Sequence, residues 1–560
     1  MTVAPRWRLR STSDAQRERY RADGYWSDAT LGDLVEQCLS ATPQSTINVW
    51  SETRPWSGTY ADAHRDALQL VTALQRAGLQ PGATVAFQLP NWHEAVVAFY
   101  GLALGGYILV PIVHIYGHKE VRFILAQSGA NAYISADRFG HVDYLDTVDG
   151  APEGDLPDLV VHVVVSTSGA AVPGASNSRV NRCTWTQLLE GCAPIEASQL
   201  PRGDAQAVCV LAYTSGTTSD PKGVIHSHES LLAELVHMGV WITPRHPNLM
   251  GSPVTHATGM LGAVLGPMRV GQPIHIIDRW DPTRVLEIML EASVGAGTGA
   301  SVFLASVVDH PNFTEAHGAL LHRVGLGGAP VPLALAERAA RRGASIIRAY
   351  GSTEHPSITG CSFDDPIDKR HSTDGPPMPG VEIKIVDDDG QRVPAGRAGE
   401  IWSRGPDLCI GYTDPTLFDR AFDADGWYHT EDMGVADAEG YVTITDRLKD
   451  IVIRGGENIS AAEVEEVIAS HPAVAEVAVV AAPDARLGEH ACAFVRLAPD
   501  DSRAALAGVD LAAIAAHLNT MGLARQKWPE ELRIVVDFPR TPSGKIRKVE
   551  LRQQLRDEAQ

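Results

Sequence analysis

The sequence predicts an α/β protein with a large N-terminal domain of parallel-rich sheets and helices, an added β subdomain, and a small α+β C-terminal domain. Its 560 residues exceed what one hydrophobic core usually supports, so more than one domain is expected. Short apolar strands alternate with helices in the first part of the chain, which is typical of parallel sheets covered by helices. Residues 380–450 instead contain short strands separated by frequent turns, and these predict a compact β subdomain.

The composition is that of an ordinary globular protein, with 44% hydrophobic and 21% charged residues. The formal charge of −21 argues against nucleic acid or an anionic membrane surface as the main partner. The seven cysteines are odd in number and form no Cys-x-x-Cys pair, which indicates reduced thiols and a cytoplasmic protein. No apolar core follows the basic N-terminus, so a signal peptide is not expected.

The run from Ala95 to Val113 is nearly uncharged and about as long as a membrane span. Glycines and Pro111 interrupt it, so we expect a buried helix and a buried strand and no integral membrane segment. His114 and His118 stand four residues apart, but a zinc site is disfavoured because no third ligand is near. Around this run, helices are expected at 17–25, 31–42, 60–77, 92–104 and 120–128, and strands at 83–89, 107–113 and 132–135.

Residues 213–224 form a loop of hydroxyls and glycines that ends in a lysine, after an apolar strand at 207–212 and before an expected helix from Ile225. Glycines allow tight turns and close approach to a ligand, and hydroxyls and free N–H groups can donate to phosphate oxygens. Lys222 adds a positive charge, but Gly223 follows it, so the loop is not a Walker motif. A plain Ser/Gly surface loop is the alternative. The candidate phosphate ligands are Thr214, Ser215, Gly216, Thr217, Thr218 and Lys222.

Four later segments, around His256, residues 350–354, Asp432 and Lys545, also combine small residues with a few polar side chains that could bind a ligand. A lone histidine such as His256 is more often a core residue, and Asp432 could be a solvated turn residue. At residues 350–354 an aromatic ring can stack on a base, a threonine can bind phosphate, and Glu354 can hold Mg²⁺ through oxygen. The basic segment 539–548, which contains Lys545, reads either as a surface loop or as part of a site.

Taken in order, these segments resemble the acyl-adenylate-forming superfamily of acyl-CoA synthetases, peptide-synthetase adenylation domains and luciferases. The likeness runs from about Leu31 to Lys548. It is closest to acyl-CoA ligases of the medium-chain and alicyclic-acid type, on the basis of residues 253–259, 350–354 and 454–460. Ser219 departs from the pattern, because glycine is usual at that position.

The resemblance implies a role for each segment. The catalytic residues would be Lys545, Lys222, His256 and Glu354, with the metal held by Glu354 and Thr217. The nucleotide would contact the loop residues above together with Gly328, Ala329, Pro330, Tyr350, Gly351, Ser352, Thr353, Asp432, Arg447 and Lys545. The acyl pocket would be formed by His256, Thr258, Gly259, Met260, Thr298 and Gly299, and CoA would pass Gly455, Gly456 and Glu457. Domains 1–448 and 449–560 would meet at Lys449, the hinge of a mobile C-terminal domain.

The implied activity is that of an ATP-dependent acyl-CoA ligase that uses ATP, Mg²⁺ and coenzyme A and acts through an acyl-AMP. The substrate would be a medium-chain, alicyclic or steroid-side-chain acid. One rival is an enzyme that loads an aryl or fatty acid onto a carrier-protein phosphopantetheine, because residues 17–26 resemble aryl-acid-activating relatives. A second rival is an inactive scaffold, which is disfavoured by the presence of Lys222, Glu354, Asp432 and Lys545. The oligomeric state stays open, with a homodimer as one option.

Overall fold

The computed structural model describes residues 7–152, 154–169, 171–214, 220–329, 331–447, 450–454, 457–484, 486–498, 509–541 and 544–559. Several residues with predicted roles lie outside these ranges: Ser215, Gly216, Thr217, Thr218, Pro330, Lys449, Gly455 and Gly456. The predicted boundary between residues 448 and 449 also falls outside them and stays a prediction. Within the described ranges, no helix has the length and apolar character needed to cross a membrane.

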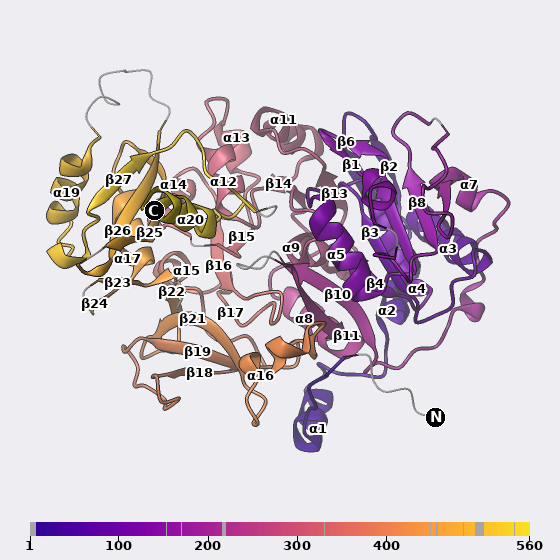
Figure 1. Cartoon of the computed structure of the whole chain (residues 1–560), viewed down its shortest axis with the longest axis horizontal. Helices are drawn as coiled ribbons and strands as arrows, with labels where there is room; N and C mark the ends of the chain where they lie inside the picture. The colour runs from indigo at the N-terminus through magenta and orange to yellow at the C-terminus, as the bar shows by residue number, and fades with distance from the viewer. Residues whose placement is uncertain are drawn as a thin grey trace.

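The N-terminal domain contains two large sheets whose central strands are parallel (Figure 1). The first has the strand order β20-β11-β10-β4-β3-β5-β8-β9, and only β11 and β20 run antiparallel to their neighbours. Its strands are β3 (Thr84–Gln88), β4 (Ile108–Pro111), β5 (Ala132–Ala136), β8 (Val161–Val165), β9 (Asn181–Thr184), β10 (Val208–Thr214), β11 (Lys222–Ser227) and β20 (Gly411–Tyr412).

The second sheet has the order β14-β12-β13-β1-β2, with β2 antiparallel at its edge, and a third small sheet has the order β15-β16-β17. Their strands are β1 (Thr46–Trp50), β2 (Trp56–Thr59), β12 (Asn248–Met250), β13 (Ile274–Ile277), β14 (Gly295–Ala296), β15 (Val324–Gly327), β16 (Ile346–Tyr350) and β17 (Thr359–Gly360). The parallel-rich α/β class is therefore confirmed.

Helices cover these sheets, and capping explains where several of them begin. Thr59 and Asp62 form a capping box at the start of α3, as Thr30 and Asp33 do for α2. The main helices of the domain are α1 (Asp14–Ala22), α2 (Leu31–Ala41), α3 (Tyr60–Arg76), α4 (His93–Leu104), α5 (His118–Ser128), α8 (His228–Met238), α10 (Gly266–Val270), α11 (Pro282–Ala292), α12 (Ser301–Val308), α14 (Leu333–Arg341) and α15 (Ile367–Ser372), with η2, a π-helical turn (Met260–Leu265).

The uncharged run at 95–113 is α4 followed by β4, as predicted. Every residue of α4 after His93 is buried, which is expected of a helix that is apolar on all sides and lies inside a protein core. This helix packs between α2, α3 and the large sheet, so the run belongs to the main core of the N-terminal domain.

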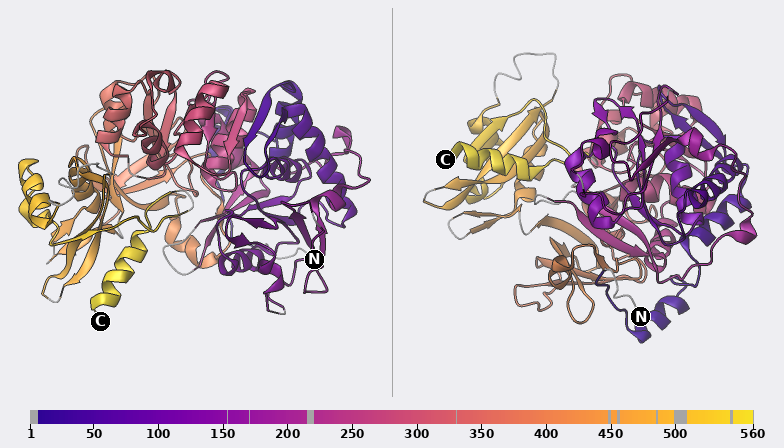
Figure 2. Two further views of the ribbon diagram at one scale, coloured as in Figure 1. Left: turned by 90° about the horizontal axis from the view of Figure 1, so that it is seen from above. Right: turned by 45° about the vertical axis from the view of Figure 1, so that its right-hand side comes forward.

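The end of the chain forms two further units (Figures 1 and 2). The antiparallel subdomain contains β18 (Glu382–Val386), β19 (Gly399–Arg404), β21 (Tyr428–Ala436) and β22 (Val442–Arg447). The C-terminal unit has its own cores around a sheet of β23 (Val452–Arg454), β24 (Glu457–Ile459), β25 (Val474–Asp484), β26 (Gly488–Leu497) and β27 (Glu531–Ile534), with helices α17 (Ala461–Ala469), α19 (Leu511–Thr520) and α20 (Lys548–Ala559).

One predicted element is wrong. The helix expected from Ile225 begins only at His228, because residues 222–227 form β11 and pair antiparallel with β10. Ser227 ends this strand and caps α8 through the backbone N–H of Ser230. The candidate phosphate loop therefore joins two antiparallel strands, whereas the sequence predicted a connection from strand to helix.

Candidate active site

A cavity of about 1270 Å³ lies where the N-terminal domain, the antiparallel subdomain and the C-terminal unit meet. Its wall includes most of the described residues that the sequence singled out. These are Thr214, Lys222, His256, Thr258, Thr298, Gly299, Gly328, Ala329, Tyr350, Gly351, Ser352, Thr353, Glu354, Asp432, Arg447 and Lys545. Residues from position 214 to position 545 thus border one space.

Gly259 and Met260 are not among the residues that line the cavity. A side chain at Gly259 would meet the Pro253 carbonyl oxygen at 1.9 Å, so this glycine allows two backbone segments to pack closely. Met260 is 3% exposed and belongs to the core behind the wall. Glu457 begins the short strand β24 of the C-terminal unit.

The β10–β11 hairpin holds the two ends of the candidate phosphate loop together. Thr214 and Lys222 are opposite each other in the register of the two strands. Gly223 packs against Thr413, whose hydroxyl oxygen would lie 2.3 Å from an added Cβ, and the Thr413 N–H donates to the Gly223 carbonyl at 2.8 Å. The lysine is therefore held at the mouth of the loop by pairing on both sides of its strand.

The turn after β16 presents the end of a strand to the cavity. An added Cβ at Gly351 would lie 1.9 Å from the carbonyl oxygen of Pro356, so the turn needs a glycine there. His226 of β11 contacts the Thr353 carbonyl through Nε2 at 2.8 Å. Burial lowers the pKa of His226, so this ring is neutral and donates through Nε2.

Glu354 closes this turn and receives a hydrogen bond from outside it. The Tyr412 hydroxyl donates to Glu354 Oε1 at 3.1 Å. Burial and then the nearby Glu354 raise the pKa of Tyr412, so the hydroxyl keeps its proton. A neutral donor orients the carboxylate without neutralising it, which leaves a charged oxygen ligand that suits a hard divalent cation.

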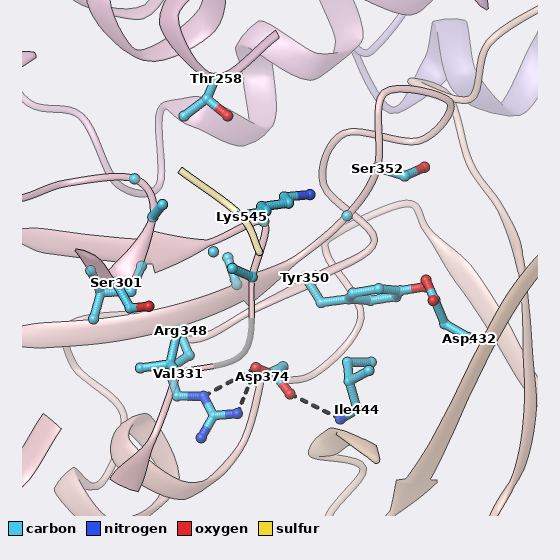
Figure 3. Close-up of a pocket in the computed structure, with 18 of the residues that line it drawn as sticks. Thr258, Ser301, Val331, Arg348, Tyr350, Ser352, Asp374, Asp432, Ile444 and Lys545 are labelled. Carbon is cyan, nitrogen blue, oxygen red and sulfur yellow. Dashed lines mark hydrogen bonds and ion pairs between the residues drawn. The ribbon is translucent and has the colours of Figure 1, made fainter. Parts of the chain in front are cut away.

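Asp432 lies at the end of the Tyr350 side chain and is held from two sides (Figure 3). The Tyr350 hydroxyl donates to Asp432 Oδ2 at 2.7 Å, and Arg447 Nε lies 3.0 Å from Oδ1. The Asp432 side chain is 6% exposed, and Arg447 is its register partner on β22. A carboxylate fixed in this way can accept further hydrogen bonds from a pair of ligand hydroxyls.

Lys545 brings the C-terminal unit into the cavity. An added Cβ at Gly328 would lie 3.7 Å from Lys545 Cε and 3.9 Å from Nζ, so the lysine side chain crosses the glycine turn after β15. In Figure 3 this side chain extends into the space bordered by Thr258, Ser352 and Tyr350. Burial and then the charge of Lys545 lower the pKa of His256 to about 4, so that ring is neutral near pH 7.

The sequence did not indicate several residues that shape the site. Arg348 Nη2 lies 2.9 Å from Asp374 Oδ1, and Asp374 Oδ2 accepts the Ile444 N–H at 2.9 Å, which ties β16 to β22 beneath Tyr350 (Figure 3). Tyr412 and His226 were missed as well. A weak signal existed for Arg348, a charged residue in an otherwise apolar strand two positions before Tyr350.

His114 and His118 do not come together with a third ligand in the part of the chain that is described. Burial lowers the pKa of His114 to about 4. His118 Nδ1 instead lies 3.0 Å from the Thr147 hydroxyl.

Comparisons with known proteins agree with this arrangement. The family profile described as AMP-binding enzyme matches residues 35–413, and that of the AMP-binding enzyme C-terminal domain matches residues 463–545. The medium-chain fatty-acid–CoA ligase of Escherichia coli (strain K12) is 32% identical over 547 residues, which cover 97% of this chain and 93% of the relative. A methyl-dioxo-octahydro-indenyl propanoyl:CoA ligase of Rhodococcus jostii (strain RHA1) is 32% identical over 502 residues, covering 89% and 93%.

Among solved structures, the anthranilate CoA ligase AuaEII in complex with anthranoyl-AMP superposes with a TM-score of 0.82. Its sequence is 25% identical, and the match covers 95% of this chain and 98% of that one. The overall arrangement of domains is therefore shared with an enzyme that binds an acyl adenylate.

Proposed function

Because the chain belongs to the AMP-binding enzyme family, we propose that it is an AMP-forming acyl-CoA ligase for a medium-chain or alicyclic carboxylic acid. In the first step a carboxylate oxygen attacks the α-phosphate of ATP, and the bond to pyrophosphate breaks. In the second step the CoA sulfur attacks the acyl carbonyl, and the bond to AMP breaks. The observation that carries the proposal is the meeting of Lys222, Glu354, Asp432 and Lys545 on one cavity.

In the first step the protein would act by positioning and by charge neutralisation, which is how phosphoryl and nucleotidyl transfers are usually catalysed. Lys222 would hold the leaving pyrophosphate, and Lys545 would neutralise charge on the carboxylate and the α-phosphate. Asp432 would accept hydrogen bonds from the ribose hydroxyls, with Arg447 beside it. The anchoring of Asp432 by Tyr350 and Arg447 supports this role, since a fixed acceptor loses little entropy on binding.

Further residues of the cavity would bind the adenine ring and the substrate carboxylate. Gly328 and Ala329 would let the backbone approach the flat adenine ring closely, and Tyr350 and Thr353 would complete the nucleotide site. Neutral His256 would lie next to the carboxylate that is activated. Its lowered pKa supports this role, because a neutral imidazole can donate one hydrogen bond without adding a second positive charge beside Lys545.

Glu354 fits a magnesium ion because it offers a carboxylate oxygen at the cavity wall and is oriented by the neutral Tyr412 hydroxyl. When bound, Mg²⁺ would neutralise charge on the phosphates. Glu354 and Thr217 would together hold it. His226 would keep the backbone of Thr353, the residue before Glu354, in place.

In the second step the C-terminal domain would turn about Lys449, withdraw Lys545 and bring Gly455, Gly456 and Glu457 to the path of the CoA thiol. A separate core supports this proposal, since a unit with its own core can rotate as one body. The relatives named as CoA ligases favour CoA over a carrier-protein phosphopantetheine as the acceptor.

The class of acid is proposed from the apolar and small side chains in the lining of the cavity, which suit an apolar acyl group. These are Met238, Trp241, Ile242, Met250, Leu261 and Gly262, together with Thr258, Thr298 and Gly299 of the predicted acyl pocket. A medium-chain, alicyclic or steroid-side-chain acid meets this description.

ATP–pyrophosphate exchange with a panel of acids tests the proposal. We expect exchange with medium-chain or alicyclic acids and little with acetate, followed by CoA-dependent release of AMP. Exchange with no acid at all would overturn the enzyme assignment and leave a binding or scaffold role. Turnover with a phosphopantetheinylated carrier protein but not with free CoA would show that the carrier protein, and not CoA, is the acceptor.

A cytoplasmic location is part of the same proposal. All seven cysteines fall within the described residues and none forms a disulfide, which suits a reducing compartment. Fractionation of the host cell with an antibody to the chain would test it.

A further inference from the structure

Three ionisable side chains from distant segments meet behind the turn that carries Glu354. Glu234 and His237 lie one helical turn apart on α8, and Asp407 lies between β19 and β20. Their side chains are 1%, 1% and 0% exposed. We propose that these three residues bind one transition-metal dication of the Zn²⁺ type as a structural site, in addition to the Mg²⁺ of the reaction.

The ligand atoms already have nearly the spacing of a metal site. His237 Nδ1 lies 3.9 Å from Glu234 Oε2 and 3.7 Å from Asp407 Oδ1, and the three ligand atoms lie within 4.8 Å of one another. Tetrahedral Zn²⁺ with bonds of about 2.0–2.2 Å places its ligands about 3.3–3.6 Å apart. The two distances from His237 would contract by a few tenths of an ångström to close around an ion, and the distance between the Glu234 and Asp407 oxygens, which is within 4.8 Å, by at most about 1.5 Å.

The hydrogen bonds of His237 point to a cation at Nδ1. Nε2 lies 2.8 Å from the Pro379 carbonyl, which can only accept, so Nε2 carries the hydrogen. Nδ1 then faces Glu234 and Asp407. A lone pair turned toward two carboxylates is unfavourable unless a positive ion lies between them. Within the described chain, neither Nδ1 nor Glu234 Oε2 has a hydrogen-bond partner.

The surroundings of the two carboxylates match those of oriented metal ligands. Ser357 donates its hydroxyl to Glu234 Oε1 at 2.9 Å, and His355 Nε2 lies 3.1 Å from Asp407 Oδ1. In the described part of the structure no lysine or arginine pairs with either carboxylate. Two carboxylates, a neutral imidazole and a dication add to zero charge, so burial of the group costs little.

The competing occupant is a proton. A proton on His237 Nδ1 would face the same two carboxylates, 3.9 Å from Glu234 Oε2 and 3.7 Å from Asp407 Oδ1. An imidazole with two carboxylates suits first-row metals at the Zn²⁺ end of the affinity series.

The site has a structural consequence for the cavity. His355 follows Glu354 directly and Ser357 comes two residues later, and both bond to the proposed metal ligands. A metal there would tie α8 to the turn that carries Glu354. Glu234 and Ser357 also border the cavity, so the ion would lie next to its wall.

The test uses the full-length protein and reads metal content, so its outcome does not depend on the proposed activity. Chelator-treated protein is dialysed against Zn²⁺ or Co²⁺, and bound metal is measured by mass spectrometry. We expect about one ion per chain and a visible Co²⁺ absorption spectrum typical of nitrogen and oxygen ligands. His237→Gln and Asp407→Asn should each weaken binding at least roughly tenfold, the lower end of what loss of a ligand's orienting partner costs.

His490→Gln is the matched control. It alters the second group of three side chains among the described residues that could hold a metal ion, Asp484, His490 and Glu530, which is partly exposed. Binding should be unchanged in this variant, and equal loss there would assign the ion to the surface group and overturn the proposal. If His237→Gln or Asp407→Asn fails to fold, Co²⁺ titration of the chelator-treated wild-type protein still measures how much metal binds. Its melting temperature shows that this protein is folded. Less than about a tenth of an equivalent bound to folded wild type would leave a proton as the occupant and refute the site.

Discussion

Replacement of Lys545 by alanine should separate the two half-reactions. The side chain crosses the turn at Gly328 and comes near enough to His256 to lower its pKa, so it places a positive charge inside the cavity. Adenylate formation develops charge at the α-phosphate, and thioester formation does not need this lysine if the C-terminal domain has turned away. Only the first step should therefore suffer.

The expected size of the loss follows from the charge that is removed. Two unit charges about 4 Å apart attract each other by about 4 kcal/mol at an effective dielectric constant near 20. Removal of one such stabilising donor from an active site typically lowers kcat about 10²–10³-fold, or about 3–4 kcal/mol. We expect a loss in this range for Lys545→Ala in ATP–pyrophosphate exchange.

The second measurement supplies the acyl-AMP and follows acyl-CoA formation. Here Lys545→Ala should stay within a few-fold of wild type. Arg556→Ala is the control from the helix that follows, because that arginine is exposed, bonds to Gln553 and does not line the cavity, so its loss should change either rate little. An equal fall of both half-reactions in Lys545→Ala, or a loss of similar size in Arg556→Ala, would refute the reasoning.

Three further predictions follow from contacts within the structure. Gly351→Ala should lower stability by about 1–3 kcal/mol in denaturant unfolding and also lower exchange, because the new Cβ would meet the Pro356 carbonyl oxygen at 1.9 Å. Asp432→Asn should raise KM for ATP about tenfold with a smaller change in kcat, because the amide is a weaker acceptor for ribose hydroxyls but keeps the shape of the side chain. His162→Gln should flatten the acid side of the stability curve. Burial and then Arg182 lower the pKa of His162 to about 3, so the unfolded chain takes up the proton first as pH falls below 6.5. Stability is therefore full above pH 6.5 and falls toward pH 3, by up to about 5 kcal/mol at about 1.4 kcal/mol per pH unit.

Each of these has a contrary outcome. Wild-type stability for Gly351→Ala would show that the turn relaxes without strain. An unchanged KM for ATP in Asp432→Asn, measured with saturating acid, would remove that residue from the nucleotide site. For His162, Ser135 and Arg182 bond to the two ring nitrogens and Asp149 pairs with the arginine. If stability falls as steeply between pH 6.5 and pH 3 in His162→Gln as in wild type, a group other than His162 causes the loss.

Short contiguous segments were the part of the site that the sequence could predict. The turn at 350–354 and the segment around Lys545 each carry several functional groups within a few residues, so their chemistry can be recognised without knowledge of the fold. The same locality explains why most helices and strands were predicted. Capping residues and apolar periodicity act over one or two turns of chain.

The hairpin at the phosphate loop shows where prediction from neighbouring residues failed. Residues 225–227 have a pattern compatible with a helix, and only their pairing with β10, with β20 on the other side of the strand, makes them a strand. Gly259 is a second case: a small residue in a candidate pocket segment proved to serve close backbone packing.

By itself, the sequence determined the α/β class, the order of the segments and the residues that bring charge to the cavity, because these depend on neighbours in the chain. Only the tertiary structure decided which groups meet. Tyr412 reaches Glu354 across 58 positions, Arg348 finds Asp374, and Asp407 joins Glu234 and His237 from a distant loop. The physical reason is that burial forces polar groups to find partners, and a packed core supplies those partners from segments far apart in the sequence.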